Sequence, residues 1–529
     1  MNLVPAPKYR RAIAFSSVVV LQWILSFWAT QVVRNVATCD TAYYYVIARN
    51  FARGRGLTDN VLWQFLNAPA TVEQPAGTYW EVGWPLFLGS ILRLFGDSQH
   101  IAIIACALLS GLVPLLTALV THQLTKRLDV AWVAGILVCL QARLWATNVV
   151  PDCTLPYQLT TLLGLFAFHH AYTAPLSRPR LIAVGMALAL PMYVRGEGFI
   201  LLLSTLPCLL LAPSRPLRAN AKKTISVVLG IGLVAAPFLV RNLAVFGEAL
   251  PHGRSLRLWM TRYDELSGFL ARPSPTVWWA QGTKILTNIR WNALEGHLEI
   301  LTYQIPWPIV ALAGLGFVLH LMRARSGRPP AALLFFLLTL LVPCLAVPLI
   351  ANVDRFVMNT APLLCMWASW AIFALADCVK SLFHKQMALL VVGLAIWSCT
   401  TMFRPPGKLA AHIAVFRVFS EERAYLNPRA LTALQLRRDD VVMTDDPWRV
   451  SAELDVATLM APLDGDASVE AAIMKYRPRF VLVSASPALQ RLVWRHKIPM
   501  HRVANFRGAT WYELDGLVKS STGQLRQTP

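Results

Sequence analysis

The sequence predicts a mainly α, polytopic helical membrane protein of about eleven spans, with a small α/β domain at its C-terminal end. Of its 529 residues, 56% are hydrophobic and only 15% are charged, whereas an ordinary soluble domain has roughly 25% charged residues. Residues 101–120 and 331–350 contain no charge and are long enough to cross a hydrocarbon core of about 30 Å. These observations exclude a soluble enzyme, a disordered chain and a disulfide-stapled secreted module.

The first apolar run, 12–33, follows a basic segment and is too long for the core of a signal peptide, so we interpret it as a retained span. The ten further predicted spans are 100–121, 130–147, 155–173, 181–194, 198–212, 224–245, 306–322, 331–350, 356–376 and 387–403. With these spans, five basic clusters lie on the same side of the membrane as the N-terminus: 126–127, 178–180, 215–223, 323–328 and 380–385. Because basic residues concentrate in cytoplasmic loops, we expect a cytoplasmic N-terminus and a C-terminal tail on the outer side.

Residues 1–403 form the predicted transmembrane domain, with long outer loops at 34–99 and 247–305. Segment 84–95 of the first loop is expected to be a helix near the membrane interface. Residues 404–529 are predicted to form a small α/β domain outside the membrane. The strands expected in it are 441–444, 480–484 and 509–514, and the helix is 468–476. Loops longer than about 15 residues are usually functional, so we expect the chemistry on the outer face.

Several common functional patterns are missing from the sequence. The net charge of +21 is explained by cytoplasmic loops, and no exposed basic stripe with interleaved aromatic residues indicates nucleic-acid binding. There is no HExxH, CxxC or Walker A pattern, and Gly54-Arg55-Gly56 lacks the third glycine of a dinucleotide-binding loop. We therefore expect no cofactor and no nucleic-acid partner, and we interpret His169-His170 as an interfacial pair rather than a metal site.

The first outer loop opens with residues that could perform chemistry. It reads Cys39-Asp40-Thr41-Ala42-Tyr43-Tyr44-Tyr45, followed by Ala48-Arg49-Asn50 and Gly54-Arg55-Gly56. Asp40 comes just after the first span, at the boundary between water and lipid, where burial beside aromatic rings raises the pKa of a carboxylate and a nearby arginine lowers it. Two interpretations remain open: Asp40 caps a helix that begins at Thr41, or it is a catalytic group.

Further motifs follow along the chain at the ends of predicted spans. They are Glu81-Val82-Gly83-Trp84-Pro85, Arg195-Gly196-Glu197, Arg241-Asn242 and Asp354-Arg355-Phe356. Together with the aspartate after the first span, the paired tyrosines and the Gly-x-Gly turn, these motifs resemble the C-type glycosyltransferases (the GT-C superfamily). Members of this superfamily use polyprenyl-phosphate sugars and include protein O-mannosyltransferases and the lipid A aminoarabinose transferase.

The resemblance implies an inverting glycosyltransferase of the bacterial inner membrane. It would move a hexosyl or pentosyl group from a polyprenyl-phosphate donor to a lipid, glycan or protein acceptor on the outer face; we expect a monomer that contacts membrane lipids. Such transfer needs a base at the acceptor and cations at the phosphate leaving group, whose charge grows in the transition state. The expected residues are Asp40 and Asp152 as catalytic carboxylates, Arg195, Arg241 and Arg355 at the donor phosphate, and Tyr43, Tyr44, Glu81 and Glu197 as substrate-binding residues.

Each of these residues also has a structural interpretation, and other functions remain open. The arginines can anchor span ends at the headgroups, and Glu81 and Glu197 can pair with nearby arginines. No DxD-like pair accompanies Asp40, which favours a metal-independent reaction over one with a divalent cation. The alternative function is a transporter or flippase of a lipid-linked saccharide, although the internal repeat found in many transporters is not visible. An inactive scaffold of the same fold is the third alternative.

Overall fold

The computed structural model describes residues 7–31, 33, 35–36, 39–67, 69–141, 144, 147–210, 216–251, 256, 259–324, 359–378, 393, 432, 434–484, 487–494, 498–506 and 509–515. The chain divides into two compact units, which we call the helical unit and the α/β unit. The helical unit comprises Met1–Arg34, Ala102–Ala244 and Asn288–Arg417, and the α/β unit comprises Asn35–Ile101, Val245–Thr287 and Val418–Pro529. The predicted domain boundary after residue 403 lies outside the described residues and stays a prediction.

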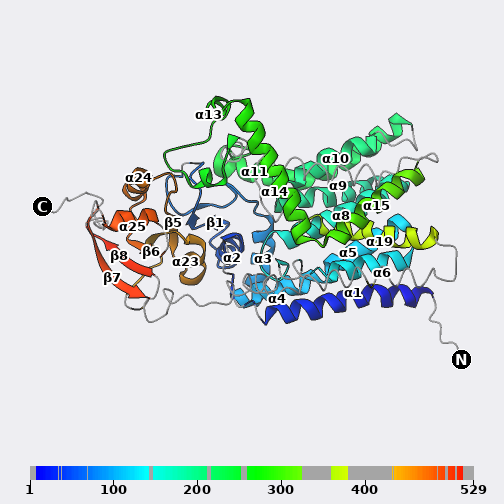
Figure 1. The fold of residues 1–529 in the computed structure, drawn as a ribbon, viewed down its shortest axis with the longest axis horizontal. Helices are drawn as coiled ribbons and strands as arrows, with labels where there is room; N and C mark the ends of the chain where they lie inside the picture. Colours follow the sequence, from blue (N-terminus) through cyan, green and yellow to red (C-terminus); the bar gives the residue numbers. More distant parts are fainter. Residues whose placement is uncertain are drawn as a thin grey trace. The chain divides into compact units, whose positions relative to one another are not determined.

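Long apolar helices make up the helical unit (Figure 1). Those lying wholly or mainly in it are α1 (Pro7–Thr30), α4 (Gln99–Ser110), α5 (Leu112–Thr125), α6 (Leu128–Cys139), α8 (Thr154–Thr173), α9 (Arg178–Val194), α10 (Gly198–Leu210), α11 (Leu217–Phe246), α14 (Thr283–Gln304), α15 (Trp307–Ala324) and α19 (Ala361–Cys378). Among the described residues, three stretches, Tyr9–Thr30, Gln99–Thr125 and Leu217–Phe246, are long and apolar enough to cross a membrane. The predicted spans 331–350 and 387–403 lie outside the described residues apart from Gly393, so the count of eleven spans is not confirmed.

Neighbouring helices of this unit pack side by side. Helix α1 packs on α5 and α6, α6 on α19, α19 on α15, and α8 on both α5 and α9. Small residues permit the closest approaches. A Cβ atom at Gly111, between α4 and α5, would lie only 2.5 Å from Nε1 of Trp23 in α1, and this indole N–H donates to the Leu108 carbonyl at 2.9 Å. A lipid environment provides no hydrophobic drive for helix association, so such close packing and hydrogen bonding hold the helices together.

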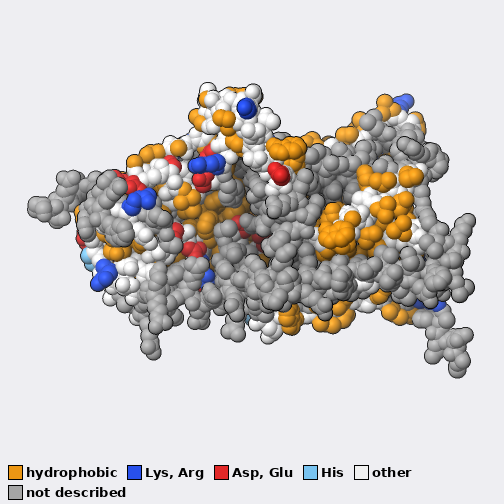
Figure 2. Space-filling model, in the orientation of Figure 1, with side chains coloured by type: hydrophobic (Ala, Val, Ile, Leu, Met, Phe, Trp, Pro, Cys, Tyr) orange, Lys and Arg blue, Asp and Glu red, His pale blue; other side chains and the backbone are white. Residues whose placement is uncertain are grey.

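Large hydrophobic side chains cover the outside of these helices. Exposed examples are Trp28 of α1, Leu203 of α10, Leu233 and Val240 of α11, and Met322 of α15. Figure 2 shows hydrophobic side chains gathered over the helices on the face that is drawn. Contiguous apolar surface of this kind is rare on soluble proteins and marks contact with lipid or another protein. The apolar helices and their uncovered hydrophobic side chains identify a membrane protein.

The α/β unit contains a mixed six-stranded sheet with the order β2-β5-β4-β6-β8-β7. Its elements are α2 (Cys39–Ala52), β1 (Thr58–Asp59), β2 (Val61–Leu62), β3 (Gln74–Pro75), α3 (Gly83–Phe95), η2 (Tyr263–Ser267), α13 (Pro275–Ala280), β4 (Val441–Thr444), α23 (Pro447–Leu454), β5 (Ala457–Met460), α24 (Asp466–Tyr476), β6 (Phe480–Val483), α25 (Pro487–Trp494), β7 (Met500–Phe506) and β8 (Ala509–Leu514). Strands β2, β5, β4 and β6 run parallel, whereas β8 is antiparallel to both β6 and β7.

The predicted elements of this unit are largely confirmed. Strands 441–444 and 509–514 form as expected, strand 480–484 ends one residue earlier, helix 468–476 begins two residues earlier, and α3 matches helix 84–95 within one residue. Strand β2 was not predicted. It comes from the first loop and pairs Val61 with Thr458 and Leu62 with Leu459 of β5. A two-residue strand has too little periodicity to be recognised, and its partner lies in a distant part of the sequence.

Candidate active site

Helix α2 carries the first group of predicted site residues on one of its faces. Asp40, Tyr43 and Tyr44 are spaced i, i+3 and i+4, which places them on the same side of an α-helix. All three are buried, with exposed fractions of 4%, 1% and 0%. The helix begins at Cys39, so Asp40 belongs to the first turn and does not precede a helix starting at Thr41, as the capping interpretation required. In that turn, a carboxylate is still favoured by the positive end of the helix dipole.

The two tyrosines pack into a cluster of aromatic rings centred on Trp80. The Trp80 ring centroid lies 4.6 Å from that of Tyr43 and 4.6 Å from that of Trp63, which is nearly parallel to it. Tyr44 lies 5.9 Å from Trp80, and Trp448 of α23 lies 5.7 Å from Trp63. Aromatic contacts of this kind contribute about 0.5–1.5 kcal/mol each beyond area burial. The cluster therefore joins α2, the first loop and α23.

Glu81 directly follows Trp80 and is also buried, with 4% exposed. The segment that carries it therefore packs on α2, and the structure brings Asp40, Tyr43, Tyr44 and Glu81 into one region of the α/β unit. Sequence reasoning missed the tryptophans of this cluster, which are Trp63, Trp80 and Trp448. Trp80 could have been found from its place beside the Glu81 motif, whereas nothing near Trp448 in the sequence indicates its partner.

Asp152 lies in the helical unit, in the turn that precedes α8. Its Oδ1 accepts hydrogen bonds from both the backbone N–H and the hydroxyl of Thr154, each at 2.7 Å. The residue is buried, with 4% exposed. Nearby, Asn148 donates to Oε1 of Gln158 at 3.1 Å, which ties the same turn to the first two turns of α8. The Asp152 carboxylate is thus held in a fixed orientation.

Arg195 and Glu197 form an ion pair next to this turn. Arg195 follows the last residue of α9, and its Nε and Nη2 donate to the two Glu197 carboxylate oxygens at 3.3 and 3.0 Å. Its Nη1 donates to Sγ of Cys153 at 3.2 Å, and its guanidinium carbon lies 5.9 Å from the ring centroid of Tyr157. Because Cys153 adjoins Asp152 in the chain, the structure brings these three predicted residues of the helical unit together. Tyr157 was missed by sequence reasoning.

Arg241 lies near the end of α11 and donates from Nη1 to Oδ1 of Asn242 at 3.2 Å. The same helix contacts the end of α9, because the Tyr193 hydroxyl donates to the Val234 carbonyl and the Tyr193 ring lies 5.3 Å from that of Phe238. Phe238 precedes Arg241 by about 4.5 Å along the helix axis. The structure therefore places the α11 segment before Arg241 beside the end of α9. Arg355, the third predicted phosphate ligand, lies outside the described residues.

Among the residues that the structure describes, no three His, Cys, Asp or Glu side chains form a group that could hold a metal ion. The predicted independence from metal stays a prediction. Chemically, the α/β unit offers a buried carboxylate among aromatic rings, and the helical unit offers a second carboxylate with arginines. These are the groups that sugar transfer from a phosphate requires: a proton acceptor and cations that stabilise a departing anion.

The fold matches solved structures of membrane enzymes, although no protein-family model and no curated protein matches the sequence. ArnT from Cupriavidus metallidurans bound to undecaprenyl phosphate aligns with a TM-score of 0.60 and 12% identity, over 96% of this chain and 99% of ArnT. The oligosaccharyltransferase of Archaeoglobus fulgidus in the apo form gives 0.58 and 13%, over 90% of this chain and 70% of that one. Archaeal AglB from the same organism, in complex with an inhibitory peptide and a dolichol-phosphate, gives 0.57 and 12%, over 96% and 75%. The chain therefore has the fold of these GT-C enzymes, and the resemblance predicted from its motifs is confirmed at the level of the fold.

Proposed function

We propose that the protein is a membrane glycosyltransferase that moves a sugar from a polyprenyl-phosphate donor to an acceptor on the outer face of the bacterial inner membrane. The observation that carries this proposal is the fold, which the chain shares over nearly its whole length with ArnT, whose structure holds undecaprenyl phosphate. The buried acidic and aromatic face of α2 supports it, because Asp40, Tyr43 and Tyr44 lie on the same side of the helix.

In the proposed reaction, a hydroxyl or amine of the acceptor attacks the anomeric carbon of the donor sugar. The new glycosidic bond forms as the bond between that carbon and the phosphate oxygen breaks, so the configuration is inverted and polyprenyl phosphate leaves. Asp40 takes the proton that the acceptor loses. Asp152, whose Oδ1 already accepts two hydrogen bonds from Thr154, is better suited to a fixed electrostatic role than to proton transfer.

The arginines bind the donor phosphate. Arg195 presents a planar fork that suits either a carboxylate or a phosphate, and in the described state Glu197 occupies two of its donors. A phosphate with more negative charge can replace Glu197, so the ion pair keeps the guanidinium oriented until the donor arrives. Arg241 and Arg355 complete the proposed set of cations. No metal ion is needed in this scheme, because the arginines neutralise the leaving group.

The remaining features of the proposal concern placement and substrates. The N-terminus lies in the cytoplasm and the C-terminal domain outside it, as the distribution of basic loops indicates. The sugar is a hexosyl or pentosyl group, the acceptor is a lipid, glycan or protein, and the enzyme acts as a monomer in contact with membrane lipids.

The test is transfer by the purified, detergent-solubilised protein. Polyprenyl phosphates carrying a labelled hexose or pentose are incubated with lipid, glycan and peptide acceptors, with and without a chelator, and the release of sugar-free polyprenyl phosphate is measured. We expect release that depends on an acceptor, survives chelation and is absent in Asp40→Asn. In proteoliposomes, movement of intact donor across the bilayer without release would instead indicate a flippase, and neither release nor movement would indicate an inactive scaffold.

A further inference from the structure

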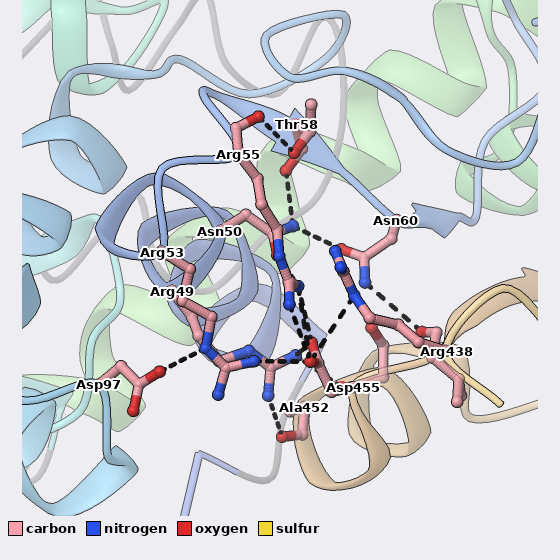
Figure 3. A network of polar contacts seen from close by, with 12 residues as sticks. Arg49, Asn50, Arg53, Arg55, Thr58, Asn60, Asp97, Arg438, Ala452 and Asp455 are labelled. Carbon is pink, nitrogen blue, oxygen red and sulfur yellow. Dashed lines mark hydrogen bonds and ion pairs between the residues drawn. The ribbon is translucent and has the colours of Figure 1, made fainter. Parts of the chain in front are cut away.

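Three arginines from α2 and the turn after it meet one carboxylate near the C-terminal end of the chain (Figure 3). Asp455 lies 2.9 Å from Nη2 of Arg49, 2.6 Å from Nη1 of Arg53 and 3.3 Å from Nη1 of Arg55. Arg438 adds a fourth cation at 3.9 Å. Burial opposes the ionisation of Asp455, but the arginines, Arg49 foremost, outweigh it and lower the pKa of this carboxyl. Asp455 is therefore an anion surrounded by an excess of cations.

Arg49 is the buried centre of this arrangement, with 4% exposed. Besides Asp455, it binds the carbonyls of Ser451 and Ala452, at 3.0 and 2.8 Å. These carbonyls belong to the last turn of α23, where the helix dipole is negative and cations are favoured. Asp455 itself ends α23 in the left-handed conformation, with φ of 55°. Arg49 thus caps α23 and pairs with its C-cap residue at the same time.

Helices α2 and α23 also carry residues of the candidate active site. Helix α2 has Asp40 in its first turn and Arg49 in its last turn, nine residues or about 13.5 Å apart along the axis. Helix α23 has Trp448 of the aromatic cluster near its start and Asp455 at its end. A contact that fixes these two helices to one another also fixes Asp40 relative to the aromatic rings.

We propose that Asp455 is a positioning residue for the transfer reaction, which holds the C-terminal end of α2 through three arginines and so sets the place of Asp40. This inference rests on the proposed function. Asp455 does not touch the reacting groups and acts through the helix. Without its charge, Arg49, Arg53 and Arg55 would repel one another, although Arg53 would keep Asp97 as a partner, and the end of α2 would move away from α23. A displacement of about 1 Å can lower a rate about 100-fold.

The test compares Asp455→Asn with Asp466→Asn, a matched control. Asparagine accepts the left-handed conformation, so the first variant removes the charge without straining the backbone. Asp466 also forms an ion pair, with Arg491 at 3.1 Å, and this pair joins α24 to α25. Hydrogen–deuterium exchange of the α2 amides and steady-state kinetics are measured on the full-length protein in detergent.

We expect the α2 amides of Asp455→Asn to exchange at least tenfold faster, while those of α24 are unchanged. Its kcat should fall at least tenfold with the donor KM within twofold of wild type, and the control should match wild type in all respects. Arg55→Gln removes the longest of the three contacts with Asp455, together with the hydrogen bond from Arg55 to Asn50. It should give the same pattern at a smaller size and covers the case in which Asp455→Asn does not fold.

Two results would overturn the inference. Unchanged exchange in α2 would mean that Asp455 does not hold the helix, and faster exchange with wild-type kcat would mean that the held position does not matter for transfer. Absence of transfer by the wild-type protein is a different failure, because it refutes the proposed function itself, while the exchange measurement still decides whether Asp455 holds α2.

Discussion

Two arginine clusters of this protein, one in each unit, differ in composition. In the α/β unit, Asp455 is shared by Arg49, Arg53 and Arg55, and Arg49 also binds two backbone carbonyls. In the helical unit, Arg195 forms an ion pair with one carboxylate, Glu197, and also donates a hydrogen bond to the Cys153 thiol. In the first cluster, one anion, Asp455, is shared by three arginines, so an arginine that moved away would lose the carboxylate that balances its charge. The second contains one ion pair, in which we propose that the donor phosphate replaces Glu197.

This difference separates structural arginines from candidate ligand-binding ones. An arginine that donates to backbone carbonyls of a packed helix cannot turn toward a ligand without undoing that packing. An arginine held by one glutamate at a span end can bind a phosphate by exchanging partners, since both anions fit the same planar fork. Changes in the Asp455 cluster should therefore affect stability and the position of α2, and changes in the Arg195 pair should affect donor binding.

The largest effect is expected from Asp40→Asn, at the other end of the helix that the Asp455 cluster holds. An amide keeps the shape of the side chain but cannot accept a proton at neutral pH, so transfer should fall by about 100- to 10,000-fold, with the melting temperature nearly unchanged. Initial rates with labelled donor measure the loss. Asp439→Asn, which alters an exposed carboxylate of the same unit, serves as the control. Retention of more than about a tenth of the activity would show that Asp40 is not the base.

Next in size is the effect of Arg49→Met on stability. The variant removes the Arg49 donor from the Ala452 carbonyl and the most buried cation from Asp455, while the Ser451 carbonyl keeps the Asp455 backbone N–H. A buried polar group left unsatisfied costs about 1–3 kcal/mol. We expect a total loss of about 3 kcal/mol, measured as lower resistance of the α/β unit to urea by tryptophan fluorescence. In Arg491→Met, which breaks the more exposed pair with Asp466, the loss should stay within about 1 kcal/mol. Equal losses in the two variants would contradict the view that Arg49 is a structural centre.

The comparison also indicates what a sequence can predict here. The Arg195–Glu197 pair lies within one short turn, so the sequence itself offers pairing as one interpretation, and the apolar helices and strands β4 and β8 follow from local patterns. Asp455 has no such local pattern, because its three nearest arginine partners lie in α2 and the turn after it, in a distant part of the sequence. Strand β2 was missed for the same reason, since Val61 and Leu62 form a strand only by pairing with β5.

A parallel limit applies to the candidate site. Asp40, Tyr43 and Tyr44 were predicted together because they belong to one short motif after the first span, and helical spacing places them on one face of α2. The aromatic partners came from three separate segments, and Trp448 reaches the cluster only because α23 packs on α2. Tertiary packing, not local propensity, decides which aromatic residues surround a site. The motifs therefore predicted the residues of α2 in the candidate site but not the aromatic residues that surround them.

A pH-dependent effect should distinguish two carboxylates of the α/β unit. Burial raises the pKa of Asp59 to about 8, only partly opposed by the hydrogen bond from the Val61 N–H, whereas Asp455 has a lowered pKa. Between about pH 4, the pKa of the unfolded group, and pH 8, folded Asp59 retains a proton that the unfolded chain releases. Its contribution to stability, complete below pH 4, therefore decreases by about 1.4 kcal/mol for each pH unit up to about pH 8.

Asp59→Asn should remove this slope, because an amide does not titrate and still accepts the Val61 hydrogen bond. Urea unfolding of the wild type and the variant at pH 5, 6 and 7 measures the difference, which should grow in favour of the variant as pH rises. For Asp455 the sign is opposite, since a lowered pKa gives stability that is lost as pH falls. A difference between wild type and Asp59→Asn that stays constant with pH would mean that Asp59 is ionised in the folded protein.

The smallest effects are expected at the Arg195–Glu197 pair, and they test whether a phosphate replaces Glu197 there. Arg195→Lys keeps the positive charge but loses the planar, forked guanidinium. We therefore expect the donor KM to rise by about tenfold, or 1.4 kcal/mol, with the acceptor KM unchanged. Arg355→Lys should behave in the same way. Glu197→Gln removes the anion that competes with the phosphate, so its donor KM should stay level or fall, and its melting temperature should change little. Steady-state kinetics with donor and acceptor varied separately give both constants. A rise confined to the acceptor KM in Arg195→Lys, or a large rise in donor KM in Glu197→Gln, would mean that the Arg195–Glu197 pair is as fixed as the Asp455 cluster.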